Sequence, residues 1–337
     1  MKRAILIGLA LLLSLAIPLS YGGFGVIMQL PEVAHWLIPT ILAMVFVGWL
    51  FNAARLRLLV SGVDGHLSRR QALATVISTE FAGAASPAGV GGPLTYVYLL
   101  HQQRVKPGHG AALYAVDHIM DLVFFSTAMP LALAVFTIDR HLDHPLWLLG
   151  LLIGLLGCGL GFIWLVLRRY RTVLRAFGPL LRRLRVSMSR RRRLARGVLQ
   201  FRHAVKLLLG MPKHRLVTLY AYCMAHWLLR YSILPVVLYA LHHPVPWSYL
   251  FVVQGMLLFA GQLSFLPGGT GSVELGFSAL LAAWLSADKL ALALILWRFA
   301  TFYWYLLAGA PVFAATAGAA TGRLLVARRH RHHESTS

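Results

Sequence analysis

The stretch that decides the fold reads Leu266-Pro267-Gly268-Gly269-Thr270-Gly271-Ser272-Val273-Glu274, and it interrupts an apolar run over about 247–286. A second interruption, Ser86-Pro87-Ala88-Gly89-Val90-Gly91-Gly92-Pro93, lies within an apolar run over about 72–101. Proline lacks a backbone N–H, and glycine lowers the cost of leaving a helix. We therefore predict one broken apolar segment in each half of the chain, with tips at Pro87, Gly91, Gly92 and Pro93 and at Pro267, Gly268, Gly269 and Gly271.

The rest of the sequence has the composition of a membrane protein. Of its 337 residues, 58% are hydrophobic and 12% are charged, whereas a soluble domain carries about 25% charged residues. Runs long enough to cross a bilayer recur along the chain. We expect an all-α polytopic membrane protein with about six full spans, over about 4–22, 36–59, 110–136, 146–167, 216–240 and 288–320. A single membrane domain would cover 1–322 and a basic tail 323–337.

The distribution of basic residues predicts the orientation. Arg55, Arg57, Arg69 and Arg70 follow the second span, and no Lys or Arg lies in the loop before it, through Glu32 and His35. The positive-inside rule then places the N-terminus and the C-terminus in the cytoplasm. It also makes the first broken segment a hairpin that opens to the cytoplasm and the second a hairpin that opens to the outside, as in an inverted-repeat transporter. The alternative is that both breaks are kinks in full spans, which would give eight or more spans. The first span could also be a cleaved signal peptide, but no convincing cleavage site follows it.

An arginine-rich stretch joins two of the predicted spans. Sixteen Lys or Arg and no acidic residue lie between Arg168 and Arg215. Between two spans such a block indicates the cytoplasmic side and attraction to anionic headgroups rather than to nucleic acid. Apolar residues at helical spacing within it predict amphipathic helices, which either lie on the membrane surface or pack against the ends of the spans. Its densest run is Arg190, Arg191, Arg192 and Arg193.

Ionisable residues inside the apolar segments are the candidate functional residues, because a charge in hydrocarbon normally faces a cavity or a partner. Two interpretations stay open. In one, these side chains line a groove where Arg298 or Arg230 meets a lipid phosphate and the carboxylates meet an amine or a proton. In the other, Glu274 pairs with Arg298, and Asp117 or Asp121 pairs with Arg230, to hold the bundle together. The full set is Glu80, Asp117, His118, Asp121, Arg230, Glu274 and Arg298.

Motifs of cofactor-dependent enzymes do not stand out. Gly268-Gly269-Thr270-Gly271-Ser272 lacks the lysine that a phosphate-binding loop requires. Cys158 and Cys223 lie in apolar runs and have no metal-ligand spacing. We therefore expect no cofactor and no metal.

The second broken segment resembles a motif of the lysylphosphatidylglycerol synthase transmembrane-region family. Pro267 to Glu274 match its Pro-Gly-Gly-x-Gly-x-x-Glu pattern, and Arg298 matches an arginine that recurs in the following span. The first half matches less well, since Gly89, Gly92 and Thr95 stand where the family has charged residues. Asp117-His118 and Asp121 resemble the family's Glu-Arg followed by Asp.

The resemblance implies a freestanding member without the soluble synthase domain, in the bacterial cytoplasmic membrane. Its implied role is translocation of anionic or aminoacylated phospholipid between leaflets, as a flippase or scramblase. Two other hypotheses remain. One is a membrane-embedded lipid-modifying transferase that uses Glu274 or Asp117 as a general base. The other is a non-transporting partner that binds a lipid-synthesis enzyme through residues 168–215.

Overall fold

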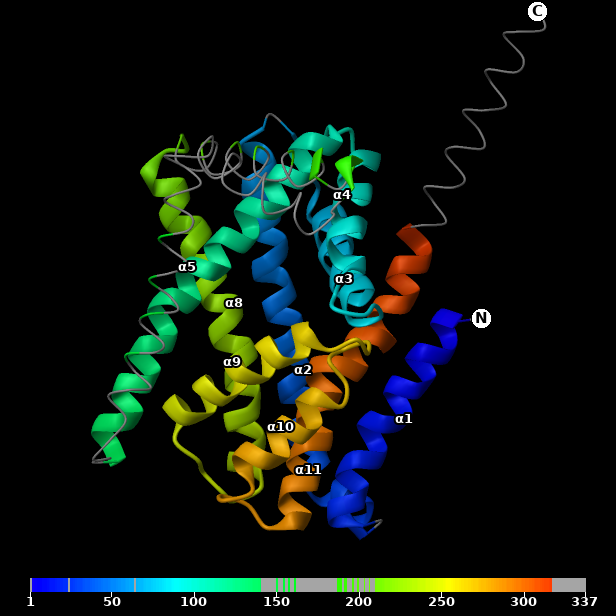
Figure 1. The fold of residues 1–337 in the computed structure, drawn as a ribbon, viewed down its shortest axis with the longest axis vertical. Helices are drawn as coiled ribbons and strands as arrows, with labels where there is room; N and C mark the ends of the chain where they lie inside the picture. Colours follow the sequence, from blue (N-terminus) through cyan, green and yellow to red (C-terminus); the bar gives the residue numbers. More distant parts are fainter. Residues whose placement is uncertain are drawn as a thin grey trace, which may run out of the picture.

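The computed structural model describes residues 2–23, 25–63, 65–140 and 210–316, together with scattered positions between 150 and 206. Helices are the only regular elements in these described residues, which confirms the all-α membrane fold (Figure 1). Four helices are apolar and long enough to cross a bilayer: His35–Ser61, Pro107–Ile138, Lys213–Ala240 and Ala287–Thr316. Each has at least 27 residues, and a span needs about 20.

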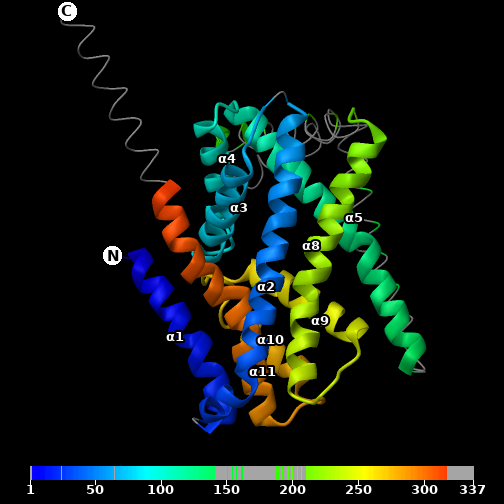
Figure 2. The same ribbon diagram turned by 180° about the vertical axis from the view of Figure 1, so that it is seen from behind.

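Two of these spans are parts of longer helices, and a further helix, α1, precedes them in the chain. Helix α1 covers Lys2–Gly22, α2 covers Gly25–Ser61, α5 covers Pro107–Arg140 and α8 covers Lys213–Ala240. The last span begins as α11, Ala287–Arg298, passes through the π-helical turn η1, Phe299–Tyr303, and continues as α-helix to residue 316. In Figure 1, α1 packs beside α11, and Figure 2 shows α2 lying along α8.

The first broken segment is a re-entrant hairpin. Helix α3, Arg69–Ala84, has 16 residues and α4, Gly91–Gln102, has 12. At about 1.5 Å per residue they measure roughly 24 and 18 Å, so neither crosses a hydrocarbon core of about 30 Å. They lie side by side in the upper part of Figure 1, and their connection lies at mid-height. A capping box at Ser68 and Gln71 begins α3, as expected where a helix starts at a polar boundary.

The second broken segment is a hairpin of the opposite orientation. Helix α9, Trp247–Leu263, has 17 residues and α10, Ser272–Leu281, has 10. Both lie in the lower part of Figure 1, and the loop between them rises toward the first hairpin. The hairpin interpretation of both breaks is therefore correct, and the kinked-span alternative is wrong.

The tips of the two hairpins meet. An antiparallel β-bridge pairs the backbone at Pro87 with the backbone at Pro267. Gly269 has φ +70°, and a Cβ there would lie 2.6 Å from the Cα of Gly261, so only glycine fits this turn. The two hairpins thus join near the middle of the bundle, 180 residues apart in the sequence (267 − 87).

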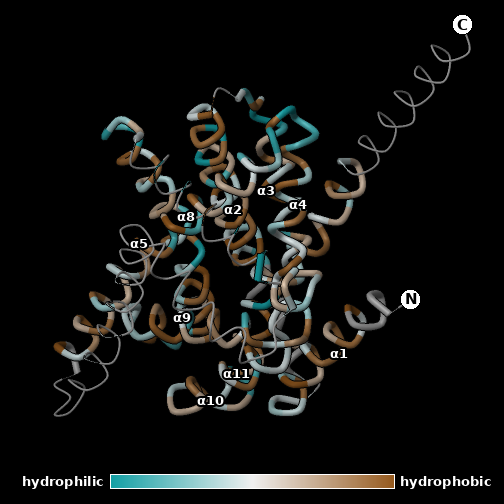
Figure 3. The backbone as a smooth tube through the Cα atoms, turned by 45° about the horizontal axis from the view of Figure 1, so that its top comes forward, coloured by the Kyte–Doolittle hydropathy of each residue, from teal (hydrophilic) through white to brown (hydrophobic). Residues whose placement is uncertain are grey.

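The outer surface is apolar, as expected for helices that face lipid. Large apolar side chains with more than 60% exposure include Leu131 and Ile138 on α5 and Val217 on α8. Figure 3 shows hydrophilic residues gathered in the connections near α2, α3 and α4, with a few more inside the bundle. The polar residues inside the bundle form the site described below.

Some predictions need correction or cannot be compared. The loop predicted over 23–35 is wrong, because α2 already begins at Gly25 after a tight turn at Gly23, where φ is +64°. The span predicted over 146–167, the amphipathic helices of 168–215 and the tail 323–337 lie almost entirely outside the described residues. Of the four clustered arginines, Arg191 and Arg192 are described, and both are helical; Arg192 is exposed.

Candidate functional site

The second hairpin tip is held by a buried ion pair. Glu274 is completely buried, and its Oε1 lies 2.7 Å from Nη2 of Arg298. Its Oε2 accepts a 2.7 Å hydrogen bond from the backbone N–H of Gly271, the residue that precedes α10. A carboxylate at the third position of a helix caps its free N–H groups and is favoured by the helix dipole. The predicted pairing of Glu274 with Arg298 is confirmed.

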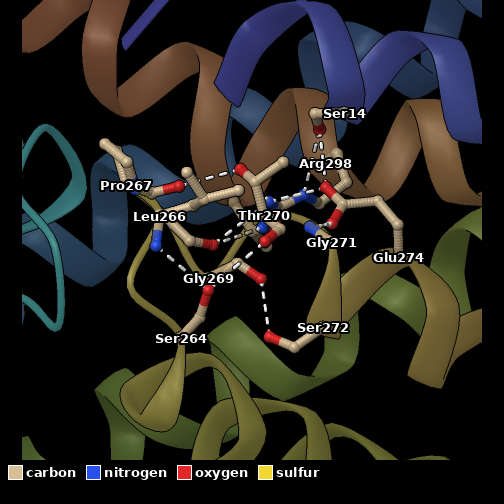
Figure 4. Close-up of polar contacts among 12 residues, drawn as sticks. Ser14, Ser264, Leu266, Pro267, Gly269, Thr270, Gly271, Ser272, Glu274 and Arg298 are labelled. Atoms are coloured by element: carbon tan, nitrogen blue, oxygen red, sulfur yellow. Dashed lines mark hydrogen bonds and ion pairs between the residues drawn. The ribbon is translucent and has the colours of Figure 1, made fainter. Parts of the chain in front are cut away.

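Helix α1 completes this cluster from the other end of the chain. Ser14 donates a 2.7 Å hydrogen bond to Oε1 of Glu274 and accepts a 2.8 Å bond from the hydroxyl of Tyr303. Arg298 also donates from Nη1 and Nη2 to the carbonyl of Gly268, at 3.1 Å each. Figure 4 shows these side chains converging on the glycine-rich loop. Every polar atom of Glu274 is therefore used in fixing the tip.

A second buried cluster surrounds Arg55 of α2. Arg55 is 2% exposed, and its Nε lies 2.6 Å from Oδ1 of Asp117. Its Nη1 lies 2.8 Å from Oδ1 of Asp121, and Nη2 donates to the backbone carbonyl of Asp117. The indole of Trp227 donates a further 2.9 Å hydrogen bond to the same oxygen of Asp121. The spacing of Asp117 and Asp121, one helical turn apart on α5, lets both carboxylates reach one guanidinium.

Arg230 of α8 has different partners. Its Nη1 donates a 2.8 Å hydrogen bond to Tyr305 and lies 3.7 Å from Oε2 of Glu80. Glu80 also accepts hydrogen bonds from Trp49 and Asn52, at 3.2 Å each. The prediction that Asp117 or Asp121 pairs with Arg230 is therefore wrong, because Arg55 takes both carboxylates and the first hairpin brings Glu80 to Arg230.

The clusters share one cavity. Its volume is about 760 Å³, within the range of about 300–1,000 Å³ for small-molecule sites. Both hairpin tips line it, and so do Arg55, Glu80, Asp117, His118, Asp121, Arg230 and Arg298. Among the tip residues predicted from the sequence, Gly92, Pro93, Gly268 and Gly269 reach the cavity wall. Six of the seven predicted site residues thus meet there, and Glu274 supports Arg298 from behind.

Sequence reasoning missed Arg55 and an aromatic lining. Arg55 looked like a marker of the cytoplasmic boundary, although it lies six residues before α2 ends at Ser61 (61 − 55). The aromatic side chains on the cavity wall include Tyr96, Tyr114, Trp227, Tyr231 and Tyr305. His226, buried beside them, contacts the carbonyl of Gly48 at 3.1 Å. In an apolar sequence rich in aromatic residues, no local signal separates these from lipid-facing ones.

The first hairpin departs from the family pattern at the cavity itself. Gly89 and Gly92, where the resemblance expects charged side chains, both line the cavity. Thr95 is buried on α4. The wall therefore carries its charges on α2, α3, α5, α8 and α11, and the tip of the first hairpin brings none of the expected ones.

Comparison with known proteins identifies the family of this chain. The family model described as "Lysylphosphatidylglycerol synthase TM region" matches residues 4–309. A protein of Archaeoglobus fulgidus, described as "UPF0104 membrane protein", is 24% identical over 287 residues, which cover 82% of this chain and 86% of the relative. With both hairpins and the Glu274–Arg298 cluster inside the matched region, the chain belongs to the lysylphosphatidylglycerol synthase transmembrane-region family.

Proposed function

We propose that the protein moves phospholipid between the leaflets of the bacterial cytoplasmic membrane, as a flippase or scramblase. One observation carries the proposal: two half-length hairpins of opposite orientation meet at a charged cavity inside an apolar bundle. Helix breaks at such a position are typical of transport sites at the bilayer midplane. Neither the family description nor the relative's name specifies a transported molecule, and the charged cavity is the feature that supports the proposal.

The cavity lowers the main barrier to lipid movement. A charged headgroup in hydrocarbon costs several kcal/mol or more, because its water is lost without replacement. Here Arg230 and Asp117 keep 25% and 24% of their side chains exposed on the cavity wall and can replace some of that hydration. Transport needs no covalent step, only this substitution of protein dipoles for water.

Exposed apolar side chains in and near the two hairpin tips suit acyl chains. Val90 at the first tip lines the cavity and is 57% exposed, and Leu94 on α4 is 68% exposed. Phe265 at the second tip is 90% exposed. Exposed apolar groups beside a polar cavity would let the chains remain in the bilayer while the headgroup crosses.

The test uses purified protein in liposomes that contain nitrobenzoxadiazole-labelled lipid in both leaflets. Dithionite added outside bleaches only the label that it reaches. We expect bleaching beyond the outer-leaflet half. Arg230→Gln should slow it, because Arg230 is more exposed to the cavity than Arg55 or Arg298. The exposed Arg57→Gln is the matched control. Bleaching that stops at half, in sealed vesicles with every lipid tested, would contradict scrambling and require an energised assay.

Orientation belongs to the same proposal. If both termini are cytoplasmic, the connection between α4 and α5 faces the cytoplasm, and the connection between α10 and α11 faces outside. Single cysteines at Arg104 and Ser286, in a chain without its native cysteines, should then react with a membrane-impermeant maleimide from opposite sides. Labelling of both from the same side would contradict the orientation.

A further inference from the structure

The carboxylates on α5 outnumber their cation. Arg55 faces both Asp117 and Asp121, which leaves one negative charge uncompensated within this cluster. Each carboxylate makes its contacts through Oδ1, and within the described residues the two Oδ2 atoms have no hydrogen-bond or ion-pair partner. Both side chains are partly exposed, at 24% and 19%, on the cavity wall. An uncompensated charge inside a membrane bundle indicates that a ligand cation belongs there.

Two tyrosines provide an independent sign of a ligand. Tyr96 and Tyr231 line the cavity and are 4% and 3% exposed. In the described part of the chain neither hydroxyl has a hydrogen-bond partner. Buried polar groups are almost always hydrogen-bonded, so two unpaired hydroxyls in one cavity indicate a polar occupant.

The rings around the carboxylates suit a cation. Tyr114 packs against Tyr96, with ring centroids 5.1 Å apart, and against the ring of His118 at 4.1 Å. On the other side, Trp227 lies 5.7 Å from Tyr231. Aromatic faces attract ammonium groups through the ring quadrupole, most strongly where water is excluded.

A cation for phosphate lies next to this group. The guanidinium carbon of Arg230 is 5.8 Å from the centroid of the Trp227 ring, while the indole N–H of Trp227 bonds to Asp121. At 3.7 Å, the ion pair between Arg230 and Glu80 is longer than the 2.6–2.8 Å pairs of Arg55. Arg230 is also 25% exposed, against 2% for Arg55. One indole therefore separates an anionic subsite from an accessible cation.

We propose that the cavity selects a zwitterionic phospholipid whose phosphate is joined to an ammonium group by a short carbon chain, as in phosphatidylethanolamine. The ammonium binds Asp117, Asp121 and the hydroxyl of Tyr96, and the phosphate binds Arg230. An anionic headgroup without an amine would bring a second negative charge toward the carboxylates. The inference rests on the proposed function and names one class of phospholipid in place of the anionic or aminoacylated phospholipid expected from the sequence.

The test measures binding, so it does not depend on transport. Native mass spectrometry of the detergent-purified protein, titrated with dioleoyl phosphatidylethanolamine or phosphatidylglycerol, gives the two apparent affinities. We expect about tenfold tighter binding of phosphatidylethanolamine, which corresponds to about 1.4 kcal/mol. Asp117→Asn should abolish this preference, and Asp288→Asn, which removes an exposed carboxylate on α11, should leave it unchanged.

A second variant tests the same preference without removing an ion pair that supports the fold. Tyr96→Phe removes a hydroxyl that has no partner in the described structure, so the fold should persist while the preference falls several-fold. Equal affinity for both lipids, or a preference that survives both Asp117→Asn and Tyr96→Phe, would overturn the inference. Competition by glycerophosphoethanolamine as strong as that of the intact lipid would overturn the lipid assignment and favour a soluble amine. Selective binding without lipid movement would refute the proposed function and leave the subsite standing.

Discussion

Replacement of Arg55 by glutamine should destabilise the protein severely. Arg55 is 2% exposed and makes ion pairs of 2.6 and 2.8 Å with Asp117 and Asp121. Its loss leaves two adjacent carboxylates without a counter-charge in a bundle that excludes water. Removing one partner of a buried ion pair costs about 3–5 kcal/mol, a large part of the roughly 5–15 kcal/mol that stabilises a typical protein. Equilibrium unfolding in mixed micelles with increasing dodecyl sulfate, followed by helical circular dichroism, measures the change in the free energy of unfolding.

Two further variants test whether the loss of stability comes from the unpaired buried charges. Arg57→Gln removes an exposed arginine from the same helix, one that donates to the carbonyl of Leu67 at 3.0 Å. Its cost should stay below about 1 kcal/mol. The combined variant Arg55→Gln, Asp117→Asn, Asp121→Asn should regain most of the free energy of unfolding that Arg55→Gln loses, because no unpaired charge remains in this cluster. If Arg55→Gln unfolds within about 1 kcal/mol of the parent, or the asparagines restore nothing, the reasoning fails.

Three other predictions concern the hairpin tips. Glu274→Ala should lower the free energy of unfolding by about 3–5 kcal/mol, because it leaves Arg298 buried without its counter-ion; wild-type stability in dodecyl sulfate titration would contradict this. Gly269→Ala should lower the free energy of unfolding by about 1–3 kcal/mol in the same titration, because alanine is strained at this positive φ and its Cβ would clash with the adjacent backbone. Gly8→Ala, with open space around its Cβ, is the control and should have no measurable cost. Cysteines at Pro87 and Pro267 should form a disulfide under mild oxidation, since bridged strand residues have Cα atoms about 4.5–5.5 Å apart. Trypsin cleavage in the arginine-rich stretch followed by a non-reducing gel detects the linked fragments, and their absence would argue against meeting tips.

The helix breaks could be predicted because their causes are local. Pro267 restricts the backbone at its own position and Gly269 frees it, so the interruption is visible in a few consecutive residues. The pairing of Glu274 with Arg298 was also foreseen as one alternative, since each was a rare charge within an apolar segment. Its role as the cap of α10 was seen only in the structure, where its Oε2 accepts a hydrogen bond from the backbone N–H of Gly271.

The partners of the remaining charges could not be predicted in the same way. Arg55 was interpreted as a marker of the cytoplasmic boundary because the positive-inside rule counts Lys and Arg near the ends of spans. The rule does not consider which face of the helix each residue occupies. Whether an arginine near a helix end points to water or into the bundle depends on the helices beside it. The packing of α2 against α5 and α8 turns Arg55 toward Asp121 and leaves Arg230 to Glu80.

The sequence by itself determined that the chain is an α-helical membrane protein with two interrupted apolar segments, because hydropathy and backbone freedom are properties of neighbouring residues. Only the tertiary structure decided that the interruptions meet and that one cavity collects charges from five helices. Arg55 and Asp121 are 66 residues apart, and Pro87 and Pro267 are 180 apart (267 − 87). Which of several buried cations neutralises a given carboxylate depends on distances across helix interfaces, and those are set by the packing of the whole bundle.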